Sequence, residues 1–289
     1  MGRTNADRCC SHPATEQVYE QNQKKWSSIF FERQINVDYL LSRSNIKVLE
    51  SLSFTDTLYA FDFDGTLAPI VAEPDNAKMT KETERLFTTL CSAVPTAIIS
   101  GRSLIDMKVR IPPGPKYLVG NHGLEGLPGA SAVYELEAMC KKWKIALAPW
   151  MKKNRDPGIV VEDKGFSLAI HYRNSRTKKL ARKSILDLVK SLDDNAKLIP
   201  GKLVFNIVPA QGPHKGLALS RVIVHSGARF GFYIGDDHTD EDVFCINERR
   251  LMTVRVGISK KSQARYYLKR QSEINQLLRH LLHFHGIEE

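Results

Sequence analysis

Short apolar runs alternate with amphipathic segments in the first half of the chain. The runs TLYAFDFD (57–64), VPTAIISGR (94–102) and KYLVGNHG (116–123) each end in polar residues or glycine. Runs of this length that stop at such residues are typical of buried strands. Between the first two runs, residues 80–94 carry apolar side chains at helical spacing, and Thr80 is suited to cap the start of that helix.

The same alternation returns after residue 212. Residues 215–227 predict a helix, and the apolar runs GFYIGDD (231–237) and LMTVRVG (251–257) predict two further strands. Strands that alternate with helices are typical of a parallel sheet covered by helices on both faces. The sequence therefore predicts an α/β fold with a doubly wound parallel sheet.

The middle of the chain has a different pattern. Residues 157–173 form two strand-like runs around an Asp-Lys-Gly turn, and residues 197–209 form a hairpin around Pro-Gly. Between them, residues 175–192 predict a helix with Ser175 as its N-cap. The order ββαββ predicts an antiparallel sheet with helical cover, which is a smaller domain inserted into the larger one.

These patterns divide the chain into three regions. Residues 51–123 and 213–289 form the predicted core domain, and residues 124–212 form the predicted inserted domain. Residues 1–50 precede both. Their polar start and weakly amphipathic continuation predict an N-terminal extension that is partly helical or disordered.

The composition argues against several classes of protein. The 289 residues are 42% hydrophobic and 26% charged, which is ordinary globular composition. No apolar run reaches the ~18 residues that cross a bilayer, and the first 20 residues lack the apolar stretch of a secretory signal. Five cysteines without a CxxC pair argue against a disulfide framework or a zinc site. We therefore expect a cytoplasmic protein with no membrane partner.

The net charge of +10 is concentrated in one segment. Residues 141–202 contain 16 Lys and Arg against 6 Asp and Glu, so this part of the inserted domain carries the whole excess. Such a segment fits nucleic acid, a membrane surface or an anionic substrate. Nucleic-acid binders interleave aromatic residues or carry a recognised motif, which this segment lacks. A domain that closes over a phosphorylated substrate explains the charge more economically.

Reactive side chains follow four of the predicted strands. Asp62 and Asp64 end the first strand, Ser100 the second, Asn121 the third and Asp236 the fourth. Open parallel sheets bind their ligands at the carboxyl ends of the strands. We therefore expect these side chains to converge on one site.

The FDFDGT sequence offers two carboxylates close together. Side chains two residues apart in a strand point the same way, and Gly65 permits a turn that brings them together. Asp62 can then attack an electrophile while Asp64 donates a proton to the leaving oxygen. Because the free carboxyl pKa is ~3.9, such an acid needs an environment that raises its pKa. A solvated loop or a structural calcium site is the alternative.

A second acidic cluster, GDDHTDED, contributes Asp236 and Asp240. Oxygen ligands from Asp62 and Asp236 would suit a hard cation, and Mg²⁺ is the natural choice beside a phosphate. The cluster lacks the spacing of Gly and Glu that a calcium-binding EF-hand loop requires. Ser100 offers a hydroxyl and Lys215 a positive charge, and both groups suit phosphate oxygens.

Together these motifs resemble the haloacid dehalogenase-like phosphatases, whose four signatures are similar to DFDGT, SGR, the lysine of HKG and GDDHTDED. Within that superfamily the chain resembles the trehalose-6-phosphate phosphatase family. The segments DFDGTLAPIVAEPDNAKM, SGRSL, GNHGLE, GPHKGLAL and YIGDDHTDEDVF stand in the expected order, and the resemblance covers roughly residues 57–260. It implies a Rossmann-like core, an α/β cap inserted between the second and third motifs, and Mg²⁺ as cofactor.

The resemblance also implies a role for each motif residue. It makes Asp62 the nucleophile that forms an aspartyl-phosphate, and Asp64 the general acid and then the general base. Ser100 and Lys215 would bind the phosphate. The implied metal site comprises Asp62, the backbone carbonyl of Asp64, and Asp236, with Asp240 supporting the metal site or orienting Lys215.

In the cap, the resemblance points to residues that bind the sugar. The family usually has Glu where this chain has Asn206, which can bond a sugar hydroxyl but supplies no charge. The other implied residues are Glu162, Lys164 and Lys202 in the cap, with Arg102 and Asn121 near the seam between the domains.

We therefore expect a Mg²⁺-dependent hydrolase that converts trehalose 6-phosphate to trehalose and phosphate. Its partner would be this small phosphorylated disaccharide, with no nucleic acid. A related sugar-phosphate phosphatase with a different glycone is one alternative, motivated by Asn206. A basic nucleic-acid-binding protein is an alternative of another class, motivated by the charge of residues 141–202. The sequence leaves the oligomeric state open.

Overall fold

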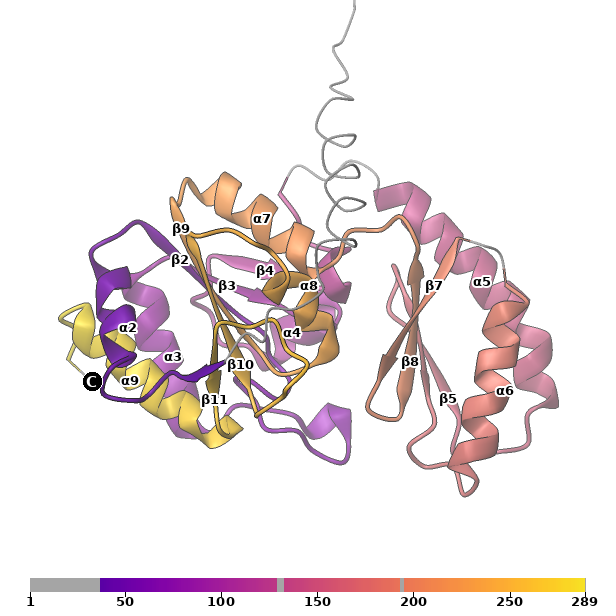
Figure 1. Cartoon of the computed structure of the whole chain (residues 1–289). Coiled ribbons are helices and arrows are strands. Elements are labelled where there is room, and N and C mark those ends of the chain that lie inside the picture. Colours follow the sequence, from indigo (N-terminus) through magenta and orange to yellow (C-terminus); the bar gives the residue numbers. More distant parts are fainter. Residues whose placement is uncertain (1–36, 129–132, 193–194, 289) are drawn as a thin grey trace, which may run out of the picture. The chain divides into compact units, whose positions relative to one another are not determined.

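The computed structural model describes residues 37–128, 133–192 and 195–288. Within these ranges the strands form one sheet of seven strands and one sheet of four (Figure 1). None of the helices in the same ranges is long and apolar enough to span a membrane. Residues 1–36, the larger part of the predicted N-terminal extension, lie outside the described residues.

The seven-stranded sheet is parallel throughout, as the alternation of strands and helices predicts. Because every strand runs the same way, the carboxyl ends of the strands lie along one edge of the sheet. The strands are, in spatial order, β1 (Asp38–Tyr39), β11 (Tyr266–Leu268), β10 (Leu251–Val256), β9 (Phe230–Gly235), β2 (Thr57–Phe61), β3 (Thr96–Ile99) and β4 (Tyr117–Val119).

Helices cover both faces of this sheet, which confirms the doubly wound prediction (Figure 1). In β2, Tyr59 and Phe61 face one core, and Leu58 and Ala60 face the other. The first core is closed by α2 (Ile46–Ser53), α3 (Lys81–Ala93), α4 (Leu104–Arg110) and α9 (Ile274–Phe284), and the second by α7 (Lys215–Ser226) and α8 (Glu241–Phe244). Single-turn 3-10 helices lie in the connections: η1 (Pro74–Asn76), η2 (Asn121–Gly123), η3 (His238–Asp240) and η4 (Gln271–Glu273).

Local signals in the sequence set the ends of several helices. The Thr80 side chain accepts a hydrogen bond from the backbone N–H of Thr83, as expected of an N-cap. Ser103 caps α4 in the same way through the N–H of Asp106. At the end of α7, Gly227 adopts φ +75°, a left-handed conformation that glycine adopts without strain.

Residues 38–50, which the sequence placed in the N-terminal extension, belong to the large sheet and its helical cover. Strand β1 pairs with β11 at the edge of the sheet, and α2 packs against α9. Leu40 and Leu49 are fully buried in the core. A strand of two residues leaves no alternating pattern in the sequence, so its place in the sheet was not predicted.

The four-stranded sheet is antiparallel, as predicted for the inserted domain. One face of this sheet packs against two helices, and the core between them includes Trp143 and Ile185 from the helices and Phe205 from the sheet. Figure 1 shows both helices on the side of this sheet away from the large one. The elements are α5 (Val133–Lys153), β5 (Val160–Asp163), β6 (Leu168–His171), α6 (Lys178–Lys190), β7 (Ala196–Gly201) and β8 (Val204–Pro209).

Two features of this region differ from the prediction. Helix α5 precedes the predicted ββαββ order and was not predicted. Helix α6 begins at Lys178, three residues after Ser175, so Ser175 is not its N-cap. Instead, the Ser175 hydroxyl accepts a hydrogen bond from the Thr177 N–H and donates one to Asp156. Its hydrogen bonds stabilise the turn before the helix.

Candidate active site

The predicted site residues gather at the carboxyl edge of the large sheet. They line a cavity of about 440 Å³, with the core on one side and the small sheet on the other. Ten of the twelve predicted residues reach this cavity: Asp62, Asp64, Ser100, Arg102, Glu162, Lys164, Lys202, Asn206, Lys215 and Asp236. The other two, Asn121 and Asp240, are fully buried beside it.

A buried lysine links two carboxylates beneath the cavity. The Nζ atom of Lys215 lies 2.7 Å from Asp62 Oδ1 and 2.7 Å from Asp240 Oδ1. Burial alone would lower the pKa of Lys215, but the two carboxylates outweigh it and hold that pKa above its ordinary value. Burial raises the pKa of Asp62, and Lys215 opposes this rise. Lys215 thus fixes Asp62 at the end of β2.

Asp240 is held by the protein through both of its oxygens. Its Oδ1 accepts hydrogen bonds from Lys215 Nζ and from the Tyr233 hydroxyl, the latter at 2.6 Å. Its Oδ2 accepts the backbone N–H of Asp237 at 2.9 Å. This geometry suits the implied role of orienting Lys215.

Asp62, Asp236 and Asp240 form a compact acidic cluster. One oxygen from each lies within 4.8 Å of the others, and Asp236 Oδ1 is buried with no hydrogen-bond partner. Burial and the charge of Asp240 raise the pKa of Asp236 to about 7. A Cβ on Gly65, at φ +83°, would lie 2.2 Å from Asp236 Oδ2, so only glycine leaves room there. An orphaned carboxylate oxygen in a set of oxygen donors fits a hard divalent cation.

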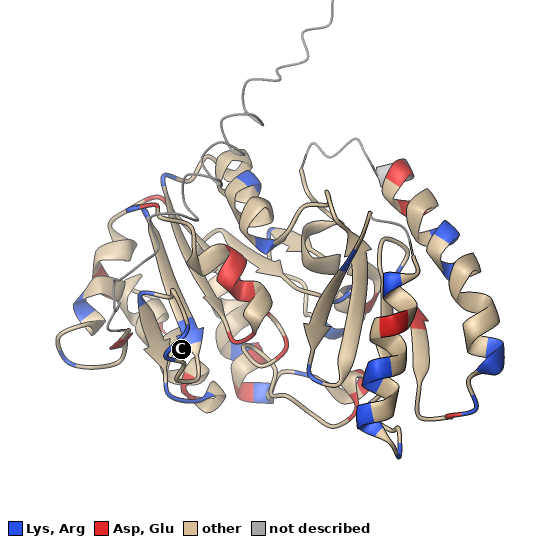
Figure 2. Ribbon diagram, turned by 45° about the vertical axis from the view of Figure 1, so that its right-hand side comes forward, with Lys and Arg blue, Asp and Glu red and all other residues tan. Residues whose placement is uncertain are grey.

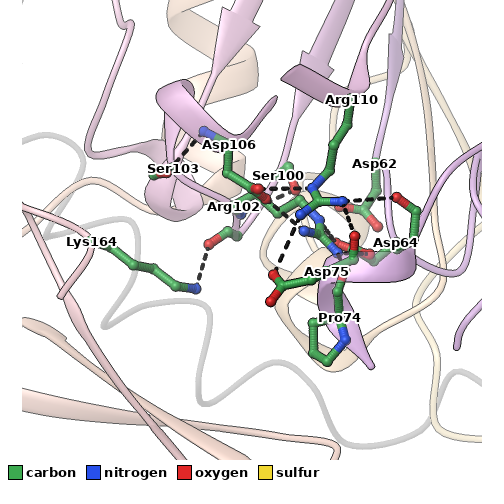
Figure 3. A network of polar contacts seen from close by, with 12 residues as sticks. Asp62, Asp64, Pro74, Asp75, Ser100, Arg102, Ser103, Asp106, Arg110 and Lys164 are labelled. Atoms are coloured by element: carbon green, nitrogen blue, oxygen red, sulfur yellow. Dashed lines mark hydrogen bonds and ion pairs between the residues drawn. The ribbon is translucent and has the colours of Figure 1, made fainter. Parts of the chain in front are cut away.

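Arg102 forms a bidentate ion pair with the Asp64 carboxylate. Its Nε lies 2.6 Å from Asp64 Oδ2, and its Nη2 lies 2.7 Å from Asp64 Oδ1 (Figure 3). The backbone N–H of Arg102 donates to the hydroxyl of Ser100, which is buried at the end of β3. Arg102 was expected near the seam between the domains, and the structure places its guanidinium directly on Asp64.

The small sheet supplies the opposite wall of the cavity. Glu162, Ala169 and Asn206 form one row across β5, β6 and β8, on the face away from α5 and α6. Glu162 Oε2 lies 2.8 Å from His171 Nε2. Lys164 Nζ donates to the carbonyl oxygen of Gly101 at 3.1 Å and to Asn206 Oδ1 at 3.4 Å. The wall is therefore polar and carries both signs of charge.

Asn121 ties the two sheets together rather than lining the cavity. Its Nδ2 donates to the carbonyl oxygen of Lys164 at 2.9 Å, and its Oδ1 accepts the Ser167 hydroxyl at 2.8 Å. Its backbone has φ +48°, which asparagine tolerates better than most residues. This contact holds the β5–β6 turn over the core.

Sequence reasoning missed His122, which also lines the cavity. Both of its ring nitrogens are buried without a hydrogen-bond partner. Burial and the nearby charges of Lys215 and Lys164 hold the pKa of His122 well below its ordinary value, which favours the neutral ring. The ring packs against Gly101, where a Cβ would lie 2.5 Å from His122 Cε1. His122 is part of the GNHG motif, but it does not directly follow the end of a strand, so the pattern of polar residues at strand ends did not identify it.

Most of the basic residues counted in the sequence lie away from this cavity. Figure 2 shows Lys and Arg along α5 and α6, which cover the other face of the small sheet. Of residues 141–202, the cationic side chains that line the cavity are those of Lys164, Arg173 and Lys202. Among the described residues of this segment, these three cationic side chains are therefore the ones placed to meet a substrate in the cavity.

Comparison with known proteins places the chain in a family. The chain is 34% identical over 193 residues to the trehalose-phosphate phosphatase of Mycobacterium avium, covering 64% of this chain and 49% of that protein. It is 30% identical over 244 residues to trehalose-phosphate phosphatase B of Arabidopsis thaliana, covering 76% of this chain and 65% of that protein. The chain thus spans about half the length of the mycobacterial relatives it matches.

Solved structures and the family's sequence model agree with these relatives. The C-terminal domain of the Candida albicans trehalose-6-phosphate phosphatase has the same fold, with a TM-score of 0.70 at 23% identity, covering 89% of this chain and 100% of that one. The model that describes the trehalose-phosphatase family matches residues 60–272, which contain every predicted site residue. The chain therefore belongs to the trehalose-phosphatase family.

Proposed function

We propose that this protein is a Mg²⁺-dependent phosphatase that hydrolyses trehalose 6-phosphate to trehalose and phosphate. One observation carries the proposal: a buried, lysine-held Asp62 lies at the floor of a cavity whose far wall is the polar face of the small sheet. The first part suits transfer of a phosphoryl group, and the second suits a sugar rich in hydroxyls. The family to which the chain belongs supports both.

In this proposal Asp62 is the nucleophile and Asp64 moves the proton. An Asp62 oxygen attacks phosphorus, so a bond from Asp62 to phosphorus forms and the bond from phosphorus to the sugar oxygen breaks. Asp64 gives its proton to the departing oxygen. Water then attacks the aspartyl-phosphate and yields its proton to Asp64. Phosphate leaves, and Asp62 and Asp64 return to their starting states.

Other groups in the cavity would bind the phosphate and offset its charge. Lys215 Nζ contacts Asp62, so a phosphate bound against Asp62 lies within its reach, and the Ser100 hydroxyl lies at the neighbouring strand end. Asp62, Asp236 and the carbonyl of Asp64 would hold Mg²⁺, which offsets the repulsion between the Asp62 carboxylate and the phosphate. Asp240 would act by holding Lys215.

A phosphate-release assay over a panel of sugar phosphates tests the proposed substrate. Trehalose 6-phosphate should have the highest kcat/KM, well above glucose 6-phosphate, because one glucose alone cannot contact the whole small-sheet wall. A higher kcat/KM for another glycosyl phosphate would support the alternative that Asn206 motivates. That outcome would replace the substrate while keeping the reaction.

The cap wall gives a prediction for Glu162. If its carboxylate bonds glucose hydroxyls, Glu162→Ala should lower kcat/KM for trehalose 6-phosphate by about tenfold to a hundredfold, since a hydrogen bond to a charged group contributes ~1.5–3 kcal/mol. A small aryl phosphate that never reaches the small sheet should be hydrolysed almost normally, because remote binding energy promotes only the reaction of the substrate that supplies it. Both substrates are measured on one preparation.

Asp163→Asn is the matched control for Glu162. Asp163 is the next residue of β5, does not line the cavity, and pairs with Lys144 at 2.7 Å. We expect this variant to keep kcat/KM for both substrates within about twofold, as is usual for exposed ion pairs. Equal losses on both substrates in Glu162→Ala would assign Glu162 a structural role instead.

A further inference from the structure

Asp106 pairs with two arginines, one just before α4 and one at its end. It stands in the first turn of α4, four residues after Arg102 and four before Arg110. Its Oδ2 lies 2.6 Å from Arg102 Nη1, and its Oδ1 lies 2.8 Å from Arg110 Nε. Figure 3 shows the carboxylate between the two guanidinium groups. Asp106 and Arg110 are four residues apart within α4 and so share one face of that helix, whereas Arg102 lies just before its N-cap, Ser103.

Both arginines also donate to backbone carbonyls of residues 74–77, and Arg102 alone reaches Asp64. Arg102 reaches Asp64 with its Nε and Nη2, and its Nη2 also donates to the carbonyl oxygen of Pro74 at 2.8 Å. Arg110 donates to the carbonyl oxygens of Asp75 and Ala77. These contacts hold Pro74, Asp75 and Ala77, which line the cavity, against α4 and the residues just before it. Asp106 therefore connects Asp64 to one wall of the cavity.

The hydrogen bonds of Arg102 favour positioning over substrate binding. Four of them go to protein groups: two to Asp64, one to Asp106 and one to Pro74. The guanidinium also lies 5.5 Å from the centroid of the Phe63 ring. A planar guanidinium that forks onto a carboxylate fixes the plane of that carboxylate, provided that the guanidinium is itself held. Asp106 holds it from the other edge.

We propose that Asp106 is a positioning residue for the reaction: it anchors Arg102 and, through Arg102, fixes the orientation of the Asp64 carboxylate toward the departing oxygen of the substrate. The inference rests on the proposed function, in which Asp64 protonates that oxygen. Asp106 itself need not touch the substrate. Loss of the Asp106 carboxylate should therefore lower kcat/KM most for substrates whose leaving group needs a proton.

The choice of leaving group distinguishes a positioning role from a purely structural one, because a structural defect would lower kcat/KM for all substrates alike. An alkyl oxygen, as in trehalose 6-phosphate or glycerol phosphate, leaves poorly without a proton. A nitrophenolate is stable as an anion and leaves without one. The kcat/KM value reports the steps up to departure of the leaving group, so the ratio of the alkyl to the aryl kcat/KM measures how well Asp64 is placed. Any unfolded fraction of the protein cancels in this ratio.

The test is Asp106→Asn, assayed with trehalose 6-phosphate, glycerol phosphate and p-nitrophenyl phosphate. Asparagine is nearly isosteric but offers one acceptor oxygen, so it can serve only one of the two arginines. We expect kcat/KM for both alkyl phosphates to fall by about tenfold and that for the aryl phosphate by less than about threefold. Arg110→Gln should shift the ratio in the same direction, because it frees one side of Asp106.

Asp56→Asn is the matched control, since Asp56 pairs with Arg229 at 2.9 Å on the surface before β2, outside the cavity. It should leave the alkyl-to-aryl ratio unchanged.

Equal losses on all three substrates in Asp106→Asn, or no loss, would overturn the inference. A loss confined to trehalose 6-phosphate would also overturn it, because that pattern means sugar binding. Wild-type protein that hydrolyses glycerol phosphate but not trehalose 6-phosphate would overturn the proposed substrate alone, whereas no hydrolysis of any monoester would overturn both proposals.

Discussion

Asp62→Asn is expected to abolish phosphate release from every substrate. The nucleophile of the proposed reaction is the Asp62 carboxylate, and an amide oxygen cannot form the aspartyl-phosphate that the second half of the reaction hydrolyses. We expect kcat to fall by at least about 1,000-fold, as it does when a covalent nucleophile is removed. The measurement is phosphate release from trehalose 6-phosphate and from an aryl phosphate under saturating Mg²⁺.

The fold should survive this substitution. Asparagine has nearly the same shape, its Oδ1 can still accept a hydrogen bond from Lys215, and Lys215 keeps its ion pair with Asp240. Circular dichroism and the binding of trehalose 6-phosphate to the variant should therefore resemble those of the wild type, as should those of the surface control Asp56→Asn. A variant that is folded and retains more than about a hundredth of the wild-type kcat would defeat the covalent mechanism.

The strand ends of the core could be predicted because burial leaves a strong pattern. β2, β3 and β9 are continuous apolar runs that stop at Asp62, Ser100 and Asp236. A parallel sheet puts such ends on one edge whatever the details of packing. The convergence of these residues on one cavity thus followed from topology alone.

Helix α5, whose apolar residues do not all follow a clear helical spacing, was not predicted. It buries Cys140, Trp143 and Leu147 at helical spacing, but Ile145 between them is 74% exposed and Pro149 lies inside the helix. An exposed apolar residue weakens the periodic signal, and proline argues against a helix interior. Tertiary packing against the small sheet outweighs both.

Contacts between side chains of separate motifs were the hardest to foresee. The sequence presented Arg102 as part of SGR and Asp64 as part of FDFDGT, and nothing local joins them. The pair Asp106–Arg110 could have been predicted from its spacing of four residues, whereas Arg102 precedes the helix and its contact with Asp106 could not. That spacing needs a helix to have meaning, and α4, with seven residues, was not predicted.

Removal of divalent cations is expected to stop most phosphate release. Excess EDTA should lower the rate below about a hundredth of its starting value, because the cation offsets repulsion between the Asp62 carboxylate and the phosphate. Added Mg²⁺ should restore the rate. Calcium should bind without restoring it, since its looser coordination tolerates a second carboxylate oxygen and misplaces Asp62. Undiminished activity in excess EDTA would count against the metal.

The stability of the protein gives an independent measure of the same site. Asp62, Asp236 and Asp240 are close together, and Asp236 Oδ1 has no partner, so a bound cation should favour the folded state. At a Mg²⁺ concentration of 100 times Kd, binding contributes about 2.7 kcal/mol, which thermal unfolding detects easily. Asp236→Asn should remove most of this Mg²⁺-dependent rise in Tm, whereas Asp56→Asn should keep it. A Mg²⁺-dependent rise in Tm that persists in Asp236→Asn would mean that Mg²⁺ binds elsewhere on the protein and that Asp236 is not its ligand.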